Sequence, residues 1–358
     1  MKTLMLSLAL LSLVLIGLSS ACVQKQEDYE VISAAEISPV LQFQVRGDDP
    51  DYQFTAPRSF TSDRDGNFYI FDYMDNVIRK FDKNGDPLLF FGGKGENPGE
   101  FSHLMAVKVF DDFLYALDSI AFNKFDLNGH FLERMEFPMA AVCNYPQIFA
   151  GEKYVGEYIL ADELKKALIV RNIDGEVLAR LTEYDLREFF PELKEGEDFY
   201  LQDTHARNYC YDFSPDGSVI WAISDEGKVY ESSGGDTKVL YSGNFNLQDF
   251  PSDTREEMEV KKNSLKENFP SLHMFVPESY QLILHLQVAI NGDIWVYLRS
   301  QQRTGFLILS PDGREKGFVR VAADFDAVDA IIRIEGDRLY FMVVENKILK
   351  IYSVPLPE

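Results

Sequence analysis

Short runs of alternating apolar and polar residues, separated by turn residues, occupy nearly the whole chain. Residues 64–92, "RDGNFYIFDYMDNVIRKFDKNGDPLLFFG", show the pattern clearly, with Asn84-Gly85 between two apolar runs. Alternation with a period of two is typical of strands with one buried face, and Asn-Gly is among the strongest hairpin signals because both residues accept positive φ. The pattern therefore predicts an all-β protein built from hairpins.

The hairpin pattern repeats along the chain. Residues 64–92 align with residues 110–137, and the matched positions are Asp72 with Asp118, Phe81-Asp82 with Phe125-Asp126, and Asn84-Gly85 with Asn128-Gly129. Weaker copies of the same strand order follow at 151–181, 209–243, 286–321 and 328–354. A supersecondary unit that recurs at a fixed period indicates a repeat architecture such as a propeller.

The sixth copy ends after three strands, and a segment near the N-terminus has no partner of its own. That segment is "VLQFQV", residues 40–45. If it supplies the missing strand, the ring closes and leaves no open sheet edge. The sequence predicts a six-bladed β-propeller of four-stranded antiparallel blades, with the last blade closed by the N-terminal strand.

Residues 75–101, "DNVIRKFDKNGDPLLFFGGKGENPGEF", resemble the NHL repeat, whose I-x-x-F-D-x-x-G-x-F/L core runs into a Gly-rich segment ending in P-G-E-F. The first two units carry this signature, and the others keep only the strand order. The resemblance implies propeller architecture and no particular function. The "GGKG" stretch is no phosphate-binding loop, because no Ser or Thr follows the lysine and no helix-forming stretch follows the glycines.

Two insertions, at about 182–208 and 252–280, interrupt the repeat between its third and fourth and its fourth and fifth units. In the first, Thr182 is predicted to cap a short helix that Pro191 ends. Both insertions join an outer strand to the next inner strand, so they emerge on the same face as the loops between second and third strands. We call this the decorated face.

The second insertion is predicted to contain a helix. Asp253 and Glu256 have the spacing of a capping box, and the helix should end near Asn268-Phe269, before Pro270. Its apolar residues form a narrow stripe, which is expected of a helix lying on a surface. The residues of this stripe are Met258, Leu265 and Phe269.

The N-terminus resembles the signal peptide of a bacterial lipoprotein. An apolar run too short for a membrane span leads through Ser19-Ser20-Ala21 to Cys22. The resemblance implies a signal peptide over 1–21, lipidation of Cys22, a tether over 22–38 and the propeller over 39–358. The family usually has Leu where Ser19 stands, so an ordinary secretory signal is the alternative. Val23, in place of the aspartate associated with inner-membrane retention, favours the outer membrane.

The composition agrees with an exported protein and limits its partners. The net charge of −23 argues against binding nucleic acid or anionic lipid through a basic face. After Cys22 only Cys143 and Cys210 remain, too few for a disulfide framework. Two free thiols are expected, with a single bridge open if the two residues lie on neighbouring strands.

Three histidines stand before inner strands, where they would approach the mouth of the central channel. His103, His205 and His285 could ligate zinc and leave one position for water or substrate. This arrangement resembles that of the peptidylglycine amidating lyases, although no HExxH motif is present. Isolated histidines hydrogen-bonded near strand ends are the favoured interpretation, and no cofactor is predicted.

Two aspartates, Asp72 and Asp118, end the second strands of the first two units. Such a pair could bind calcium or act as acid and base. An aspartate at a strand end more often accepts hydrogen bonds from the backbone N–H groups of its own turn, and that interpretation is favoured here.

Candidate binding residues on the decorated face are arginines, which suit an acidic ligand, and one tyrosine, which suits stacking on a sugar or side chain. They are Arg58, Arg207, Arg299, Arg303 and Tyr73. No G-x-S-x-G elbow is present. The sequence favours a non-catalytic, lipid-anchored binding propeller for an envelope protein, peptide or glycan. A metal-assisted lyase or hydrolase at the channel mouth is the alternative, and a purely structural protein is the third hypothesis.

Overall fold

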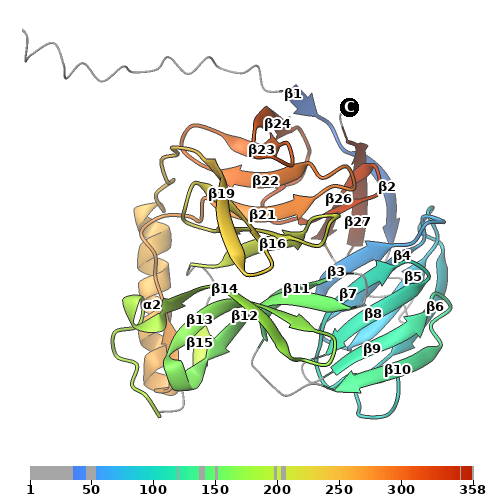
Figure 1. Ribbon diagram of the computed structural model, residues 1–358, viewed down its shortest axis with the longest axis horizontal. Coiled ribbons are helices and arrows are strands. Elements are labelled where there is room, and N and C mark those ends of the chain that lie inside the picture. The colour runs from blue at the N-terminus through green and yellow to red at the C-terminus, as the bar shows by residue number, and fades with distance from the viewer. Residues whose placement is uncertain are drawn as a thin grey trace, which may run out of the picture. The chain divides into compact units, whose positions relative to one another are not determined.

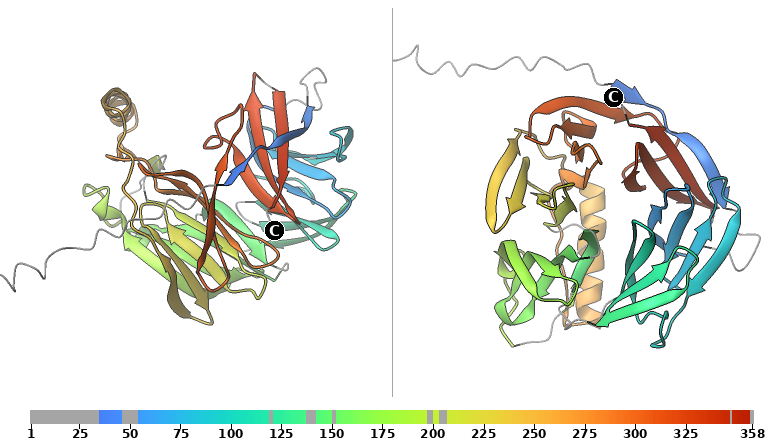
Figure 2. Two further views of the ribbon diagram at one scale, coloured as in Figure 1. Left: turned by 90° about the horizontal axis from the view of Figure 1, so that it is seen from above. Right: turned by 45° about the vertical axis from the view of Figure 1, so that its right-hand side comes forward.

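A computed structural model describes residues 35–45, 54–118, 121–136, 142–149, 152–196, 200–202, 207–346 and 348–356. They form six four-stranded antiparallel sheets arranged around a common centre, which confirms the predicted six-bladed propeller (Figure 1 and the right-hand view of Figure 2). In blades 1 to 5 the strands pair in sequence order, from the inner strand outward.

The blades have the following strands. Blade 1 is β3 (Pro57–Ser62), β4 (Phe68–Asp72), β5 (Val77–Phe81) and β6 (Pro87–Gly92). Blade 2 is β7 (Leu104–Phe110), β8 (Phe113–Asp118), β9 (Ala121–Asp126) and β10 (Phe131–Glu136). Blade 3 is β11 (Val142–Phe149), β12 (Lys153–Leu160), β13 (Lys165–Asn172) and β14 (Val177–Asp185), with a 3₁₀ turn η2 (Ala161–Glu163) between β12 and β13.

Blade 4 is β16 (Tyr209–Phe213), β17 (Val219–Ile223), β18 (Lys228–Ser233) and β19 (Asp236–Ser242). Blade 5 is β21 (Ile283–Val288), β22 (Ile294–Arg299), β23 (Thr304–Leu309) and β24 (Glu315–Val321). Blade 6 is β25 (Ile331–Glu335), β26 (Arg338–Glu345), β27 (Ile348–Pro355) and β2 (Val40–Val45).

The N-terminal strand β2 closes the ring, as predicted. It pairs antiparallel with β27, with Val40 opposite Ser353 and Val45 opposite Leu349. A further strand, β1 (Ala35–Ile37), runs parallel to β24 and adds a fifth strand to blade 5. The sequence did not reveal β1, because three residues are too few to show a period. It lies within the range 22–38 that was predicted to be a tether.

The Asn-Gly turn of blade 1 takes part in this closure. Gly85 has a φ of +89°, whereas Asn84 keeps an ordinary negative φ, and Asp82 accepts hydrogen bonds from the backbone N–H groups of Asn84 and Asp86. A Cβ atom on Gly85 would come within 2.5 Å of the Phe43 ring in β2. The glycine therefore serves both the turn and the packing of the closing strand.

Aromatic side chains fill the spaces between neighbouring blades. Phe43 lies with its ring centroid 5.1 Å from that of Phe68, edge to face, and Phe68 lies 5.4 Å from Tyr340 in blade 6. Between blades 1 and 2, Phe91 lies 5.1 Å from Phe125. Pairs at these separations have favourable quadrupole geometry and bury large areas, so they hold separate sheets together.

In the first insertion, the predicted helix capped by Thr182 is wrong. Thr182 lies inside β14, opposite Leu168 of β13, because its strand continues to pair with its neighbour instead of ending there. A single 3₁₀ turn follows, η3 (Leu186–Glu188), and it is capped by Asp185, which accepts the N–H of Arg187 at 2.8 Å.

The second insertion contains the predicted helix, α2 (Ser252–Asn268), which ends at the expected residue. The predicted capping box is wrong: Pro251 occupies the N-cap position, and Asp253 accepts the N–H of Thr254. No residue of α2 is buried, and Phe269, which follows it, is 59% exposed. The helix lies outside the blade sheets, on one face of the ring (Figure 2).

The two insertions meet through a small parallel sheet. Its strands are β15 (Tyr200–Gln202) from the first insertion and β20 (Leu272–Met274) from the second. Within the described ranges, no helix is long and apolar enough to span a membrane.

Closure by β2 predicts that Phe43 carries a large share of the stability. Phe43→Ala should lower the free energy of unfolding by about 3–5 kcal/mol, because the ring is 5% exposed and leaves a cavity. Denaturant unfolding followed by tryptophan fluorescence measures this. Phe90→Ala, at a ring that is 52% exposed, is the matched control and should change stability by about 0.5 kcal/mol or less. Equal losses in both variants would contradict closure through Phe43.

Candidate functional site

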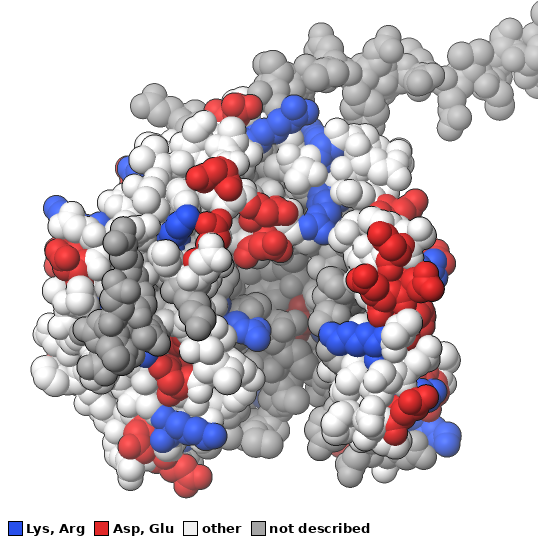
Figure 3. All heavy atoms as spheres, turned by 180° about the vertical axis from the view of Figure 1, so that it is seen from behind, with Lys and Arg blue, Asp and Glu red and all other residues white. Residues whose placement is uncertain are grey.

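The inner strands of five blades line a cavity of about 160 Å³ in the central channel. Its lining residues are Arg58 (β3), Gln147 (β11), Tyr209, Cys210 and Tyr211 (β16), Leu284, His285, Leu286 and Gln287 (β21), and Ile331 and Arg333 (β25). We call the space lined by these residues the channel cavity. Seen from behind, the molecule is hollowed near its middle, with Lys and Arg side chains beside the hollow (Figure 3).

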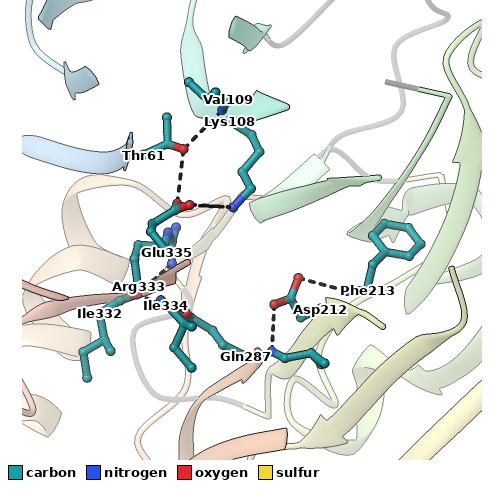
Figure 4. A network of polar contacts seen from close by, with 11 residues as sticks. Thr61, Lys108, Val109, Asp212, Phe213, Gln287, Ile332, Arg333, Ile334 and Glu335 are labelled. Atoms are coloured by element: carbon teal, nitrogen blue, oxygen red, sulfur yellow. Dashed lines mark hydrogen bonds and ion pairs between the residues drawn. The ribbon is translucent and has the colours of Figure 1, made fainter. Parts of the chain in front are cut away.

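Polar side chains at the ends of the inner strands join the blades to one another (Figure 4). Thr61 of blade 1 accepts the N–H of Val109 in blade 2 at 3.2 Å and donates to Glu335 in blade 6 at 3.1 Å. Lys108 approaches the same Glu335 oxygen at 3.2 Å. These contacts tie three separate sheets together at one end of the channel.

Blades 4, 5 and 6 are joined in the same way. The Gln287 amide donates to the Ile332 carbonyl and accepts from the Ile334 N–H, so a blade 5 side chain pairs with the backbone of blade 6 (Figure 4). Asp212 of blade 4 accepts the N–H of Val288 at 3.0 Å. Burial raises the pKa of Asp212, while that hydrogen bond and the charge of Lys108 oppose the rise.

A buried ion pair within blade 3 also bonds to the start of blade 4. Lys166 Nζ lies 2.9 Å from Glu157 Oε2, and each side chain is 1% exposed. Glu157 also accepts the N–H of Tyr209 at 2.6 Å, and Lys166 donates to Asn208 Oδ1 at 2.6 Å. The pair therefore fixes the start of β16, which enters the channel. Sequence reasoning missed it, although a glutamate inside the apolar run "YVGEYIL" was the available signal.

The thiol and the imidazole of the channel cavity are not arranged as a nucleophile and base. Burial raises the pKa of Cys210 to about 12, with the Glu157 charge adding to the rise, and its Sγ lies 3.6 Å from the Ile283 carbonyl. Burial, with Arg333 nearby, lowers the pKa of His285 to about 4. A catalytic thiolate needs the opposite shift in the pKa of its cysteine. Cys210 is a free thiol, and the Cys143 side chain lies outside the described residues.

Three of the predicted binding residues come together at the rim of the channel. The Arg58 guanidinium lies 4.8 Å from the centroid of the Tyr73 ring, and that ring lies 4.8 Å from the His103 ring, edge to face. Arg58 and His285 line the same cavity. Residues of blades 1 and 2 thus stack on one another, and Arg58 of this group lines the channel cavity together with His285 of blade 5.

The other predicted arginines are engaged elsewhere. Arg207 Nη2 lies 3.0 Å from Asp225 Oδ2, and Arg303 Nη1 lies 3.3 Å from Glu315 Oε1. Arg299 stacks on Tyr280 at 4.4 Å. None of the three lines the channel cavity as its described residues define it.

The structure also bears on the residues that the sequence offered as metal ligands. Within the described part of the chain, no group of three or more His, Cys, Asp and Glu side chains could hold a metal ion. His205 lies outside the described residues, so the convergence of His103, His205 and His285 stays a prediction. The carboxylates of Asp72 and Asp118 accept backbone N–H groups, from residues 55, 56 and 74 and from residues 102 and 103 respectively. Backbone N–H groups are the donors, as predicted, but only residue 74 belongs to the aspartate's own turn; the others lie in the segment before the inner strand of the same blade.

A second hollow lies beside the start of α2, with a volume of about 630 Å³. We call it the helix groove, and it is lined by Asp249, Phe250, Ser252, Arg255, Glu256, Glu259 and Glu278. Arg255 lies 3.5 Å from Glu278, which leaves the lining with a marked excess of negative charge. Phe250 packs on Tyr280 with ring centroids 3.9 Å apart. The sequence located the insertion but not the groove.

Comparisons with known proteins support the fold alone. No protein-family model and no curated protein matches the chain. Among solved structures it is similar to a member of the duf4221 family from Bacteroides vulgatus, at 10% identity and a TM-score of 0.52, over 88% of this chain and 96% of that one. It is also similar to a protein from Bacteroides fragilis described as exported, at 13% identity and a TM-score of 0.51, over 92% of this chain and 98% of that one. A streptogramin B lyase scores 0.45 at 11% identity, over 86% and 85% of the two chains, which carries no argument about chemistry.

The lowered pKa of His285 predicts a pH-dependent loss of stability. The unfolded chain binds a proton at this histidine near pH 6.5, whereas the folded protein binds it only near pH 4. The contribution of the neutral His285 imidazole to the free energy of unfolding is therefore fully present above pH 6.5, and it is lost as the pH falls from 6.5 towards 4. Between pH 7 and 4.5, the free energy of unfolding of His285→Gln should fall by about 1–3 kcal/mol less than that of the wild type, as measured by denaturant unfolding. Parallel losses in both proteins would show that His285 is not buried as a neutral imidazole.

Proposed function

We propose that this protein is an exported, lipid-anchored binding propeller that recognises a basic segment of a cell-envelope protein in the helix groove. The observation that carries the proposal is the joining of the two insertions, which are far apart in the sequence, into one structure on the decorated face through β15 and β20. In this proposal the propeller is a rigid support, and recognition lies on its inserted segments.

Several contacts support a rigid platform. His273 Nδ1 lies 2.9 Å from Glu192 Oε1, which links the second insertion to the first. Phe275 packs edge to face on Phe189, with ring centroids 5.0 Å apart, and on Phe190 at 6.2 Å. A surface held by such contacts loses little conformational entropy on binding, which favours affinity.

The chemistry of the helix groove favours a basic protein segment over a glycan. Its carboxylates, with Arg255 as the one basic residue in the described lining, complement lysine or arginine side chains. A sugar would need an open aromatic face, but Tyr280 is already packed against Phe250 and stacked under Arg299. The volume of about 630 Å³ suits several residues of an extended peptide.

The groove can be tested by site-specific photo-crosslinking in cells. A photoreactive residue at Val260 of α2, which is 65% exposed, should capture an envelope protein. The same residue at Lys83, in an exposed turn between β5 and β6 on the opposite face, should not capture it. Glu256→Gln with Glu259→Gln should reduce the adduct at Val260 at least tenfold, because a desolvated charge pair is worth more than about 1.4 kcal/mol.

Glu257→Gln with Glu267→Gln is the matched control, since it makes the same change at exposed positions of α2 outside the groove lining. Identical adducts at Val260 and Lys83, or equal losses in both double variants, would refute recognition by the groove. Stoichiometric zinc in protein purified without chelator, lost on His103→Ala or His285→Ala, would favour the metal-assisted enzyme instead.

The lipid anchor has its own test. Cys22→Ser should move the protein from the membrane fraction to the soluble fraction. In this proposal the lipid chains on Cys22, and not a membrane-spanning helix, supply the membrane affinity. Fractionation with immunodetection measures this, and incorporation of labelled palmitate checks the modification directly. A Cys22→Ser protein that stays with the membrane would contradict the lipoprotein assignment and favour another mode of attachment.

A further inference from the structure

The charged side chains that line the channel cavity are already engaged within the protein. Arg333 donates to the Ile332 carbonyl at 3.0 Å, and its charge favours the ionised form of the buried Asp212. Arg58 stacks on Tyr73 at 4.8 Å and has further interactions within the protein. A charge that is compensated inside the fold gains little from an added ion. The neutral groups of the lining therefore decide what the cavity binds.

Two neutral side chains of the lining have unused hydrogen-bonding groups. They are the imidazole of His285 in β21 and the carboxamide of Gln147 in β11, and both side chains are half-buried. In the part of the chain that the structure describes, neither side chain has a hydrogen-bond partner. Polar groups drawn into a partly closed space favour a ligand that completes their hydrogen bonds.

The protonation of the lining defines what the ligand must offer. Burial lowers the pKa of His285 to about 4, so at pH 7 its neutral ring has one N–H donor and one acceptor nitrogen. The carboxamide of Gln147 also offers both kinds of group. Burial keeps the thiol of Cys210 protonated, and that thiol is directed at the Ile283 carbonyl. The complementary ligand is therefore uncharged and carries both a donor and an acceptor.

The places of the two side chains in the ring separate that donor from that acceptor. Gln147 belongs to the inner strand of blade 3 and His285 to the inner strand of blade 5, and β16 of blade 4 lies between these strands. A hydroxyl presents its donor and its acceptor on a single oxygen. A secondary amide presents an N–H and a carbonyl on different atoms, so it suits two groups on different blades.

The size and apolar lining of the cavity restrict the ligand further. A cavity of about 150 Å³ holds benzene, so the channel cavity, at about 160 Å³, has room for roughly six non-hydrogen atoms. Leu284, Leu286 and Ile331 supply the apolar part of the wall. Short alkyl groups on the ligand gain by burial against these side chains.

We propose that the channel cavity binds a small neutral amide. Its N–H and carbonyl are shared between His285 and Gln147, and its alkyl groups lie against the apolar wall. This site is distinct from the helix groove and does not depend on recognition there. The amide belongs either to a free small molecule or to the acetamido group of an amino sugar that enters from the channel mouth.

Isothermal titration of the full chain, purified in detergent, tests the proposal with N-ethylacetamide as the probe. The probe should bind saturably at one site. Ethyl acetate has nearly the same shape and keeps the carbonyl but lacks the N–H, so it should bind about tenfold more weakly or not at all. Butyrate, which is similar in size but charged, should also bind about tenfold more weakly or not at all, because the neutral groups do not replace its hydration.

Substitutions of His285 test its part in the site. His285→Phe keeps a ring but removes both hydrogen-bonding atoms, so it should weaken N-ethylacetamide about tenfold or more. His285→Gln keeps a neutral donor and acceptor and should bind more tightly than His285→Phe. His130→Phe makes the same change at a histidine whose side chain is 77% exposed in a turn, and it should leave the affinity unchanged.

A second pair of variants tests the other side of the cavity. Gln147→Leu should weaken N-ethylacetamide several-fold, whereas Gln301→Leu, at an exposed position, should not. The melting temperatures of all variants show whether they fold. The double variant Glu256→Gln, Glu259→Gln should bind the probe like the wild type, so failure of the groove and failure of the cavity are distinguishable.

The methyl glycoside of N-acetylglucosamine, compared with N-ethylacetamide, distinguishes the sources of the amide. Tighter binding of the glycoside assigns the site to an acetamido sugar, and the reverse assigns it to a free small amide; either supports the proposal. Folded wild-type protein that binds neither probe would overturn it. Equal binding of N-ethylacetamide and ethyl acetate, tighter binding of butyrate, or equal losses in His285→Phe and His130→Phe would also overturn it.

Discussion

Pairing of β2 with β27 is the constraint on which the rest of the molecule depends. Each blade is a separate sheet, and the ring exists only because the N-terminal strand supplies the outer strand of the last blade. The closing strand is fixed by its ladder and by Phe43, which packs against a glycine that tolerates no side chain at its turn. Closure brings six inner strands around one centre, and the channel cavity follows from that.

Side-chain hydrogen bonds then hold the inner strands in register. Backbone ladders run within blades, so contacts between blades rely on groups such as Thr61, Gln287 and Asp212, each of which bonds the backbone of a neighbouring blade. Glu157 and Lys166, a buried ion pair within blade 3, serve the same purpose through their hydrogen bonds to Tyr209 and Asn208 at the start of blade 4. Breaking such a pair by removing one partner is costly, because the other charge remains buried. The channel is consequently a rigid support for the residues that line it.

The molecule carries two hollows of opposite character. The helix groove is rich in carboxylates, whereas the described lining of the channel cavity carries two guanidinium groups and an apolar wall. In a strongly acidic protein the first follows the general surface charge and the second departs from it. The pKa shifts of Cys210 and His285 favour the uncharged forms of both side chains in the cavity.

The sequence by itself determined the six units, the closing strand at 40–45 and the end of α2, because strand period, Asn-Gly turns and a following proline act within a few residues. It also placed Arg58, Tyr73 and His103 on one face, where they stack. The tertiary structure alone decided where each charge lies: nothing local distinguishes Arg333, which lines the channel cavity, from Arg303, which does not line it and pairs with Glu315. The β15–β20 sheet and the pairing of β1 with β24 likewise join segments that are far apart in the sequence and that only the tertiary structure brings together.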